Sequence, residues 1–581
     1  MLKKIALIFP PSHDFSMPYL APAYLKGYLD YFSDVKCKVF DLNNEFYINV
    51  IGGNELKVRK EKLSNHIRKG DICSAVNDSI GLEEFCQEKL SSIEDSKYKF
   101  SLKKITTTYN QYFSANILKE LAITSKLERY LETIIKETDL TDYNVFGITI
   151  SVEDQIIPSF IISKIIKKFH IKSTIILGGS IPTRLTNEIA STGLSQFADY
   201  IIKHEGELSL LNLMSFLTDG KQTFISNDPK IVDLGKNDSI HENDTIAFKN
   251  QKTVNIDHAK FFPNFEDLKL DNYLAPNLII PLNITRRCYW AKCDFCSIYY
   301  TWDPKHRVKS IDNVISEIKH QVKKHNVQYF RIVDDSIPPK VLYELAHSLI
   351  NNKIGIYYEI YSRFETKFLS QNFCDILYKS GCRQIFFGLE NIGTRTLNLV
   401  NKGKHITETN INQILENTFD AGISNYLFLL FGIPQAPVAD EELTVEYIIN
   451  NKKISTVAIG TFLVDRFSPI HLDPKVRIKY KISLYDKGDM TTEFGYKYKG
   501  KVIFSDNKNR TKMYLKSIFS KRPDLAISSL LNEETRLILA STFGNTFLNK
   551  YMRIATPENI STIIAHAVEK TASERIYRQL S

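Results

Sequence analysis

Residues 287–297 read Arg287-Cys-Tyr-Trp-Ala-Lys-Cys-Asp-Phe-Cys-Ser297, which brings Cys288, Cys293 and Cys296 into one short stretch. Three thiolates can bind an iron–sulfur cluster and leave one iron open to a substrate, whereas four would complete its coordination and favour electron transfer. An apolar, strand-like run, Leu278-Ile-Ile-Pro-Leu-Asn-Ile-Thr285, comes directly before. The cluster would then lie at the carboxyl end of a strand, where α/β folds place their chemistry.

The cysteines alone leave other readings open. A zinc site with three cysteines and one histidine would need His306, which follows Cys296 by ten residues, outside the usual ligand spacing. Buried cysteines without a ligand fit poorly because Lys292 and Asp294 interrupt the stretch and indicate a loop. A disulfide is disfavoured because we find no export signal in the sequence.

Size and composition predict a multidomain soluble protein. A chain of 581 residues exceeds what one core supports, so two to four domains are expected. No apolar stretch approaches the roughly 18 residues that span a bilayer. The net charge of +9 is spread along the chain, with a mild basic cluster at Lys57, Arg59, Lys60, Lys62, Arg68 and Lys69. No aromatic residues interleave there, so we interpret it as a solvated helix face rather than a nucleic-acid or membrane-surface site. Because the sequence shows neither a signal peptide nor a membrane-spanning stretch, we expect a cytoplasmic protein.

The first part of the chain has the β–α–β alternation of a doubly wound parallel sheet. Apolar strand-like runs occur at residues 5–9, 37–42, 145–151, 174–180 and 198–202, with a helical pattern after the first and after the third. Gly178 and Gly179 follow one of these strands, where glycine lets the backbone approach a ligand closely. A polar, mostly helical insertion is expected at about residues 54–139.

From residue 276 onward, strand and helix signals alternate. We expect strands at residues 278–285, 329–333, 354–361, 383–389, 426–431 and 457–464. These make six βα units, fewer than the eight of a closed barrel. Polar or glycine residues follow several strands: Asp334, Asp335, Arg363, Glu390 and Gly432. Because the carboxyl ends of parallel strands share one edge, these residues would face the same mouth as the cysteines.

The cysteine stretch and its setting resemble the radical S-adenosylmethionine superfamily. In that family three cysteines bind a [4Fe–4S] cluster in a partial barrel, and S-adenosylmethionine chelates the open iron. One electron then cleaves it to methionine and a 5′-deoxyadenosyl radical, which abstracts hydrogen from an unactivated carbon. The common spacing is CxxxCxxC, whereas four residues separate Cys288 from Cys293 here.

The resemblance also implies which residues contact S-adenosylmethionine. Phe295 matches the aromatic residue before the last cysteine, near the adenine, and Asp334-Asp335 matches the motif that supports the methionine amino group. Arg363 and Glu390 match positions that contact methionine carboxylate or ribose. The stretch Asn401-Lys-Gly403 and Gly432, in Phe431-Gly-Ile-Pro434, also follow family motifs.

The first domain resembles the cobalamin-binding domain of one large branch of this superfamily. The matching pieces are Ile8-Phe-Pro-Pro11, Gly147-Ile-Thr-Ile-Ser151, Leu177-Gly-Gly179 and His204-Glu-Gly-Glu207. This resemblance implies cobalamin contacts at Ser151, Gly178, Gly179, Glu205 and Gly206. The Asp-x-His-x-x-Gly motif that supplies a histidine to the cobalt is absent, and His13 has the wrong neighbours to replace it.

Together these features predict a cobalamin-binding Rossmann-like domain at 1–215, a linker at 216–275, a radical barrel of (β/α)6 type at 276–471 and a mainly helical region at 472–581. We expect [4Fe–4S], S-adenosylmethionine and cobalamin as cofactors, with methylation of an unactivated carbon in a small molecule or peptide. The reductant would be of flavodoxin or ferredoxin type. The alternatives are radical rearrangement, cyclisation or oxidation, and a non-catalytic iron–sulfur or zinc scaffold.

Overall fold

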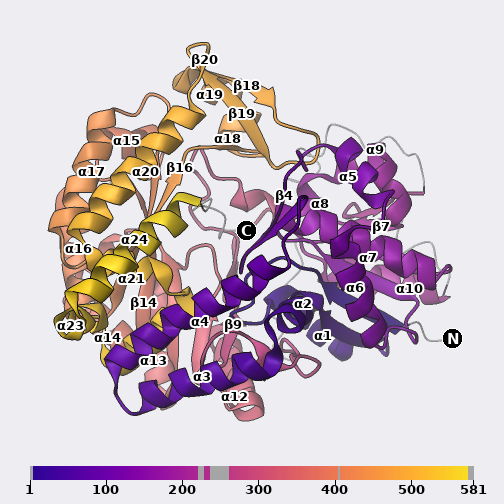
Figure 1. The fold of residues 1–581 in the computed structure, drawn as a ribbon, viewed down its shortest axis with the longest axis horizontal. Helices are drawn as coiled ribbons and strands as arrows, with labels where there is room; N and C mark the ends of the chain where they lie inside the picture. The colour runs from indigo at the N-terminus through magenta and orange to yellow at the C-terminus, as the bar shows by residue number, and fades with distance from the viewer. Residues whose placement is uncertain (1–3, 220–227, 236–260, 404–405, 574–581) are drawn as a thin grey trace.

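The computed structural model describes residues 4–219, 228–235, 261–403 and 406–573 (Figure 1). The amino-terminal part, on the right of Figure 1, contains a six-stranded sheet in the order β2-β1-β5-β6-β7-β8. All its neighbouring strands are parallel except β7 and β8. The strands are β1 Lys4–Phe9, β2 Lys36–Asp41, β5 Val145–Thr149, β6 Thr174–Gly178, β7 Tyr200–Ile202 and β8 Ile231–Asp233.

Strand order reverses between β1 and β5, so right-handed crossovers place helices on both faces of this sheet. On one side α1 packs against α10, and on the other α6 packs against both α2 and α7. These helices are α1 Leu20–Phe32, α2 Leu42–Ile51, α6 Lys126–Glu137, α7 Ile156–Phe169 and α10 Glu207–Asp219. Two short helices follow β6: α8 Ser180–Arg184 and α9 Thr186–Ser191.

The insertion between β2 and β5 is mainly helical, with one hairpin. Besides α2 and α6 it holds α3 Gly53–Arg68, α4 Ile72–Ser92, β3 Tyr98–Phe100, β4 Ile105–Thr107 and α5 Ser114–Leu121. Helix α4 extends toward the carboxyl-terminal helices (Figure 1), where Asn77 accepts a hydrogen bond from Tyr551 at 2.7 Å. Lys60, expected to be solvated, is buried and donates to the carbonyl of Asp271 at 2.7 Å. Its long apolar stem lets it lie under the chain that follows the first domain.

The second sheet is a six-stranded parallel half-barrel in the order β16-β15-β14-β13-β12-β9. Its strands are β9 Ile279–Leu282, β12 Tyr329–Ile332, β13 Tyr357–Ser362, β14 Cys382–Glu390, β15 Ser424–Phe431 and β16 Thr456–Thr461. The intervening helices are α12 Ile311–His325, α13 Pro339–Asn351, α14 Gln371–Lys379, α15 Thr394–Leu399, α16 Glu408–Asp420 and α17 Val438–Asn450. The predicted six βα units are confirmed.

Two predicted strand ends were wrong. Ile354 lies in the turn that follows α13, where its N–H donates to the carbonyl of Leu349 at 3.0 Å, so β13 begins only at Tyr357. The last predicted strand divides: β17 Val464–Asp465 leaves the barrel and pairs with β19 Glu493–Tyr498. Gly381 follows the C-cap of α14 at φ +108°, where glycine commonly ends a helix, and a Cβ there would meet the carbonyl oxygen of Ile356 at 1.9 Å.

The carboxyl-terminal region combines a small sheet with helices. Strand β19 also pairs with β18 Ile482–Asp486 and with β20 Lys501–Val502. The short β10 Thr285–Arg286 and β11 Arg307–Val308 flank the cysteine loop. The helices are α18 Pro469–Leu472, α19 Pro474–Tyr480, α20 Phe504–Lys521, α21 Pro523–Leu530, α22 Glu533–Phe543, α23 Phe547–Ile554 and α24 Pro557–Ser573.

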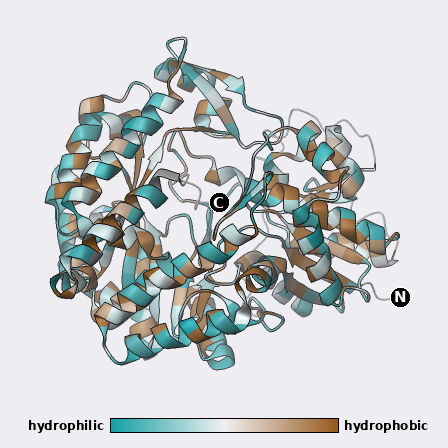
Figure 2. Cartoon of the chain, in the orientation of Figure 1, coloured by the Kyte–Doolittle hydropathy of each residue, from teal (hydrophilic) through white to brown (hydrophobic). Residues whose placement is uncertain are grey.

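One continuous core of buried apolar side chains extends through both large sheets. Figure 2 shows much of α3 in the hydrophilic colour, as its outward position requires. The first sheet continues past residue 215 to β8, a three-residue strand too short to leave a sequence signal. Residues 236–260 of the expected linker lie outside the described residues. In the part of the chain that the structure describes, no helix has the length and apolar character needed to span a membrane.

Candidate active site between the two sheets

A large cavity of about 1220 Å³ lies between the first sheet and the half-barrel. It borders the carboxyl ends of β5 and β6 at Thr149 and Gly178, next to the point where strand order reverses. The half-barrel contributes Asp334, Asp335 and Tyr361, among others. Ligand pockets usually have about 300–1,000 Å³, so this cavity has room for more than one ligand.

The cysteine loop follows β10 at the carboxyl end of the first barrel strand, where the sequence predicted it. Contacts with the segment after α15 hold it in place. The N–H of Asp294 donates to the carbonyl of Val400 at 3.2 Å, and Trp290 Nε1 donates to the carbonyl of Asn401 at 3.0 Å. The Asp294 carboxylate also accepts from Lys479 Nζ at 2.7 Å. Hydrogen bonds from both the barrel and the carboxyl-terminal region therefore hold the loop in place.

All three loop cysteines are half-buried free thiols. Burial raises the pKa of Cys296 well above its ordinary value, and the negative charges of Cys293 and Cys288 raise it further, so the three sulfurs are electrostatic neighbours. Burial also raises the pKa of Cys293, while the positive charges of Lys402 and Arg363 act in the opposite direction. Within the described residues no three His, Cys, Asp or Glu side chains gather as a site for one metal ion. In an iron–sulfur cube each thiolate binds a different iron, so its ligands need not share one metal atom.

Asp334 and Asp335 lie at the end of β12 on the cavity wall, with different partners. Asp334 accepts from the N–H groups of Ile284 (2.9 Å) and Thr285 (2.5 Å), so it fixes the turn that leads into the cysteine loop. Asp335 accepts from Trp302 Nε1 at 2.9 Å. Burial raises the pKa of each carboxyl to about 7, and the charge of Asp334 contributes to the shift at Asp335.

Arg363 and Glu390 both contact Lys402, the middle residue of the Asn401-Lys-Gly403 motif. Lys402 Nζ donates to Glu390 at 2.8 Å, and Arg363 donates to the carbonyl of Lys402 at 2.6 Å. Glu390 has φ +67°, a region that non-glycine residues adopt at a cost. None of the three lines the large cavity; they lie on the side of Cys293. Their contacts with S-adenosylmethionine stay predictions.

Phe295 and Gly432 belong to the wall behind the cysteine loop. Phe295 packs against an apolar cluster that includes Val400, Leu430 and Ile433. Gly432 has φ +75°, and a Cβ there would lie 2.8 Å from the Asn507 side chain, so only glycine fits between β15 and α20. Asn507 also donates to the carbonyl of Gly432 at 3.1 Å.

The glycines after β6 form part of the first-domain wall. Gly178, Gly179 and Gly206 all line the cavity. Gly179 has φ +102°, and a Cβ would lie 2.5 Å from the carbonyl oxygen of Ile150, whereas a Cβ on Gly178 would meet nothing closer than 3.8 Å. Ser151, by contrast, is buried and does not line the cavity; its N–H donates to Gln155 at 2.8 Å, and its contact with cobalamin stays a prediction.

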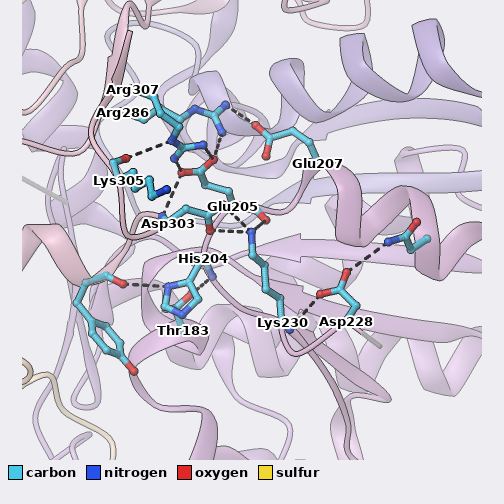
Figure 3. Close-up of polar contacts among 12 residues, drawn as sticks. Thr183, His204, Glu205, Glu207, Asp228, Lys230, Arg286, Asp303, Lys305 and Arg307 are labelled. Atoms are coloured by element: carbon cyan, nitrogen blue, oxygen red, sulfur yellow. Dashed lines mark hydrogen bonds and ion pairs between the residues drawn. The ribbon is translucent and has the colours of Figure 1, made fainter. Parts of the chain in front are cut away.

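Glu205 lies in a buried group of six charged residues that we call the interface ion cluster (Figure 3). Its members are Glu205, Glu207 and Lys230 of the first domain, and Arg286, Asp303 and Arg307 of the cysteine-loop region. Glu205 accepts from Arg286 at 2.7 Å and from Arg307 at 2.9 Å, and Lys230 pairs with Asp303 at 2.6 Å. Three negative and three positive side chains thus join the two sheets. Contact of Glu205 with cobalamin stays a prediction.

The structure adds cavity residues that the sequence analysis did not single out. The segment after β4, including Thr108 and Phe113, comes from the insertion, and Glu533, Glu534 and Arg536 come from α22. The interior of the half-barrel contributes Arg331 and Tyr426. Charged residues in the middle of apolar strands, such as Arg331 and Glu359, were the signal that could have revealed this interior.

Comparison with known proteins gives distant relatives in sequence, and no family model matches the chain. An uncharacterised methyltransferase of Pyrococcus horikoshii is 21% identical over 310 residues, which is 53% of this chain and 64% of the relative. The anaerobic magnesium-protoporphyrin IX monomethyl ester cyclase of Rubrivivax gelatinosus is 25% identical over 231 residues, which is 37% of this chain and 38% of the relative. The chain thus spans less than two thirds of the length of either relative.

Solved structures match over almost the whole chain. The cobalamin-dependent S-adenosylmethionine radical enzyme OxsB, with aqua-cobalamin bound, has a TM-score of 0.59 at 12% identity over 98% of this chain and 80% of OxsB. The radical S-adenosylmethionine methyltransferase TsrM of Kitasatospora setae, with cobalamin and a [4Fe–4S] cluster bound, has a TM-score of 0.56 at 12% identity over 99% of this chain and 100% of TsrM. The predicted fold class is confirmed: this chain has the fold of the cobalamin-dependent radical S-adenosylmethionine enzymes.

Proposed function

We propose that this protein is a radical S-adenosylmethionine enzyme that methylates an unactivated carbon of a small molecule or peptide with the help of cobalamin. The observation that supports it best is the position of the three-cysteine loop. Arg286 and Ile298, which flank the loop, line a cavity whose opposite wall is the glycine-rich edge of a Rossmann-like sheet, and the loop itself follows the first barrel strand. That arrangement suits an enzyme that brings two cofactors to one substrate.

The cysteine loop fits an iron–sulfur cluster. Its donors are three free thiols without a fourth cysteine in the loop, and the positive charges of Lys402 and Arg363 offset part of the rise that burial causes in the pKa of Cys293. In our proposal Cys288, Cys293 and Cys296 would hold a [4Fe–4S] cluster, which when bound supplies the electron for reductive cleavage of S-adenosylmethionine. Asp334 is a positioning residue, because it holds the backbone turn before the loop.

The residues around the loop also suit the polar groups of S-adenosylmethionine. Asp335 borders the cavity beside the cysteine loop and can accept from an amino group, which agrees with the role expected for the Asp334-Asp335 motif. Arg363 and Glu390 would contact the methionine carboxylate or the ribose of S-adenosylmethionine from the side of Cys293. Phe295 would pack near the adenine, and Gly432 would contribute through its backbone, because the Asn507 side chain fills the space that a side chain at 432 would take.

The first-domain wall fits a large planar cofactor. Gly178, Gly179 and Gly206 bring bare backbone to the cavity at the strand-order reversal, where ligands of doubly wound sheets bind. We propose that these glycines, with Ser151, would hold cobalamin, which when bound supplies the methyl group. Both OxsB and TsrM carry cobalamin in structures of the same fold.

A pair of glycine variants tests this wall. In Gly178→Ala the new methyl group meets only the carbonyl oxygen of Ile202, at an ordinary contact distance of 3.8 Å, so we expect a melting temperature close to wild type but about tenfold less retained cobalamin. In Gly179→Ala both the positive φ and the contact with Ile150 oppose the side chain, so unfolding should occur about 3–10 °C lower. Gly500→Ala, at φ +83° in open space, is the control for backbone strain alone. Unchanged cobalamin retention in Gly178→Ala would contradict the assignment.

The decisive experiment is anaerobic purification with cobalamin supplied, followed by metal and sulfide analysis, absorbance, and incubation with S-adenosylmethionine and a one-electron reductant such as flavodoxin or ferredoxin. We expect iron, sulfide, bound cobalamin and formation of 5′-deoxyadenosine. Zinc without iron or sulfide would favour a scaffold instead. Once a substrate is known, product mass separates methylation, which adds one CH₂, from rearrangement, cyclisation or oxidation.

A further inference from the structure

The inner face of the half-barrel carries a chamber that the cofactors described above do not explain. Side chains alternate along each strand, so the residues between the outward apolar ones point inward. On β12 the outward Phe330 and Ile332 flank the inward Arg331, and on β13 Tyr358 and Ile360 alternate with inward Glu359 and Tyr361. The inward aromatic residues form one buried cluster: Tyr361, Phe386, Tyr426 and Phe428.

Helix α22 contributes the remaining charged residues of this chamber. Asn532 caps the helix by accepting from the N–H of Thr535 at 2.7 Å, which brings Glu533 and Glu534 to its first turn. Arg331 forms ion pairs with Glu533, with Glu534 at 2.5 Å and with Glu359 at 3.0 Å. We define the barrel chamber as the four aromatic residues together with Arg331, Glu359, Glu533, Glu534 and Arg536.

The charges of the barrel chamber do not balance. Three carboxylates face two guanidinium groups, and Arg536 uses its own Nη1 for the carbonyls of Ser528 and Leu531, reaching Glu533 only at 3.9 Å. Lys103, another cation of the cavity, also acts on Glu533, but it pairs with Asp14 at 3.4 Å, and Asp14 in turn acts on Glu534, so including both still leaves one carboxylate in excess. Burial raises the pKa of Glu359 to about 8 and that of Glu534 to about 7 against the effect of Arg331. A buried carboxylate in excess costs free energy unless a cation joins it.

Two phenol groups provide a second, independent indication of a ligand. Tyr361 and Tyr426 line the cavity and are only 8% and 7% exposed. Among the described residues no hydrogen bond is found for either hydroxyl, so a ligand in the cavity could supply the partner that polar groups in protein interiors normally have. Tyr361 stacks on Phe386 at 4.7 Å between ring centroids, and Phe386 lies 4.8 Å from Tyr426, so the wall beside these hydroxyls is flat and apolar.

We propose that the barrel chamber is the substrate site and selects a small organic cation, namely a protonated amine attached to a flat apolar group. The amine would complete the charge balance beside Glu534 and donate to the tyrosine hydroxyls, and the apolar group would lie on the aromatic wall. This inference rests on the proposed function, since it names the substrate class of the same cavity. Helix α22 would then be the specificity-determining element.

Three matched probes test the chamber on the full chain without turnover: phenethylamine, phenethyl alcohol and hydrocinnamate, which are cationic, neutral and anionic. We expect phenethylamine to bind about tenfold more tightly than hydrocinnamate in calorimetry or saturation-transfer NMR. Glu534→Gln should reduce this preference to about twofold. Glu446→Gln, on the exposed face of α17, is the matched control and should leave it unchanged.

Tyr426→Phe keeps the aromatic wall and removes one hydroxyl, so it tests the chamber even if Glu534→Gln folds poorly. We expect it to weaken phenethylamine binding about fivefold with little change for phenethyl alcohol. Equal binding of the three probes, or a preference that survives in both variants, would overturn the inference. Because binding is measured without S-adenosylmethionine or reductant, a chain that prefers the amine but forms no 5′-deoxyadenosine would refute the proposed function and leave the chamber assignment standing.

Discussion

The Cys293→Ala variant is expected to lose its iron–sulfur cluster and, with it, all detectable formation of 5′-deoxyadenosine from S-adenosylmethionine. Removing one of three thiolates leaves two, which cannot hold a cube that already has one open corner. The loop itself should stay in place, because Asp294 and Trp290 fix it through contacts that do not involve the sulfur. Iron and sulfide per chain, visible absorbance and chromatography of the nucleoside product measure the effect.

Cys73→Ala is the matched control for this variant. Cys73 is also a half-buried free thiol, but it lies on α4, outside the cysteine loop. We expect wild-type iron content and wild-type nucleoside formation. If Cys293→Ala makes as much 5′-deoxyadenosine as Cys73→Ala, the three-cysteine cluster is not the reacting centre.

Glu205→Ala is expected to destabilise the protein by about 3–5 kcal/mol, the usual cost of leaving a buried charge without its partner. Arg286 and Arg307 both lose their shared carboxylate, and the buried Arg286 is left with the carboxylate of Glu207 (Figure 3). The first calorimetric unfolding transition should fall by about 6–15 °C. Glu266→Ala is the control, because the Glu266–Lys324 pair has side chains 51% and 46% exposed and should contribute at most about 1 kcal/mol.

The loss of stability in Glu205→Ala is expected to depend on pH. Burial alone would raise the pKa of Glu205, but Arg286 and Arg307 outweigh it and hold that pKa at about 2. The stabilisation is therefore complete above the unfolded pKa of about 4.3 and is lost as the pH falls through that value toward 2. The difference in melting temperature between wild type and Glu205→Ala should shrink between pH 5 and pH 3. A difference that stays constant over that range would show that Glu205 acts through packing and not through its charge.

Several elements could be predicted because their signals are local. The half-barrel strands follow from apolar runs, and β14 and β15 appear within a residue or two of the expected bounds. The glycine at 381 ends its helix for a reason visible in the sequence, since only glycine adopts that φ without cost. By contrast, β8 and β17 are too short to carry a periodic pattern, and the turn after α13 was predicted as the start of a strand.

The site residues likewise divide into those that a local sequence pattern predicts and those that only the folded chain brings together. The spacing of three cysteines in one loop is a property of consecutive residues, so the sequence by itself determined where a cluster would bind and which strand would present it. Glu205 and Arg286 are 81 residues apart, and Arg331 and Glu534 are 203 apart. No local pattern records such pairs, because side chains meet at those separations only after the two sheets and α22 have packed. The tertiary structure alone therefore decided that Glu205 joins the domains and that α22 completes the interior of the barrel.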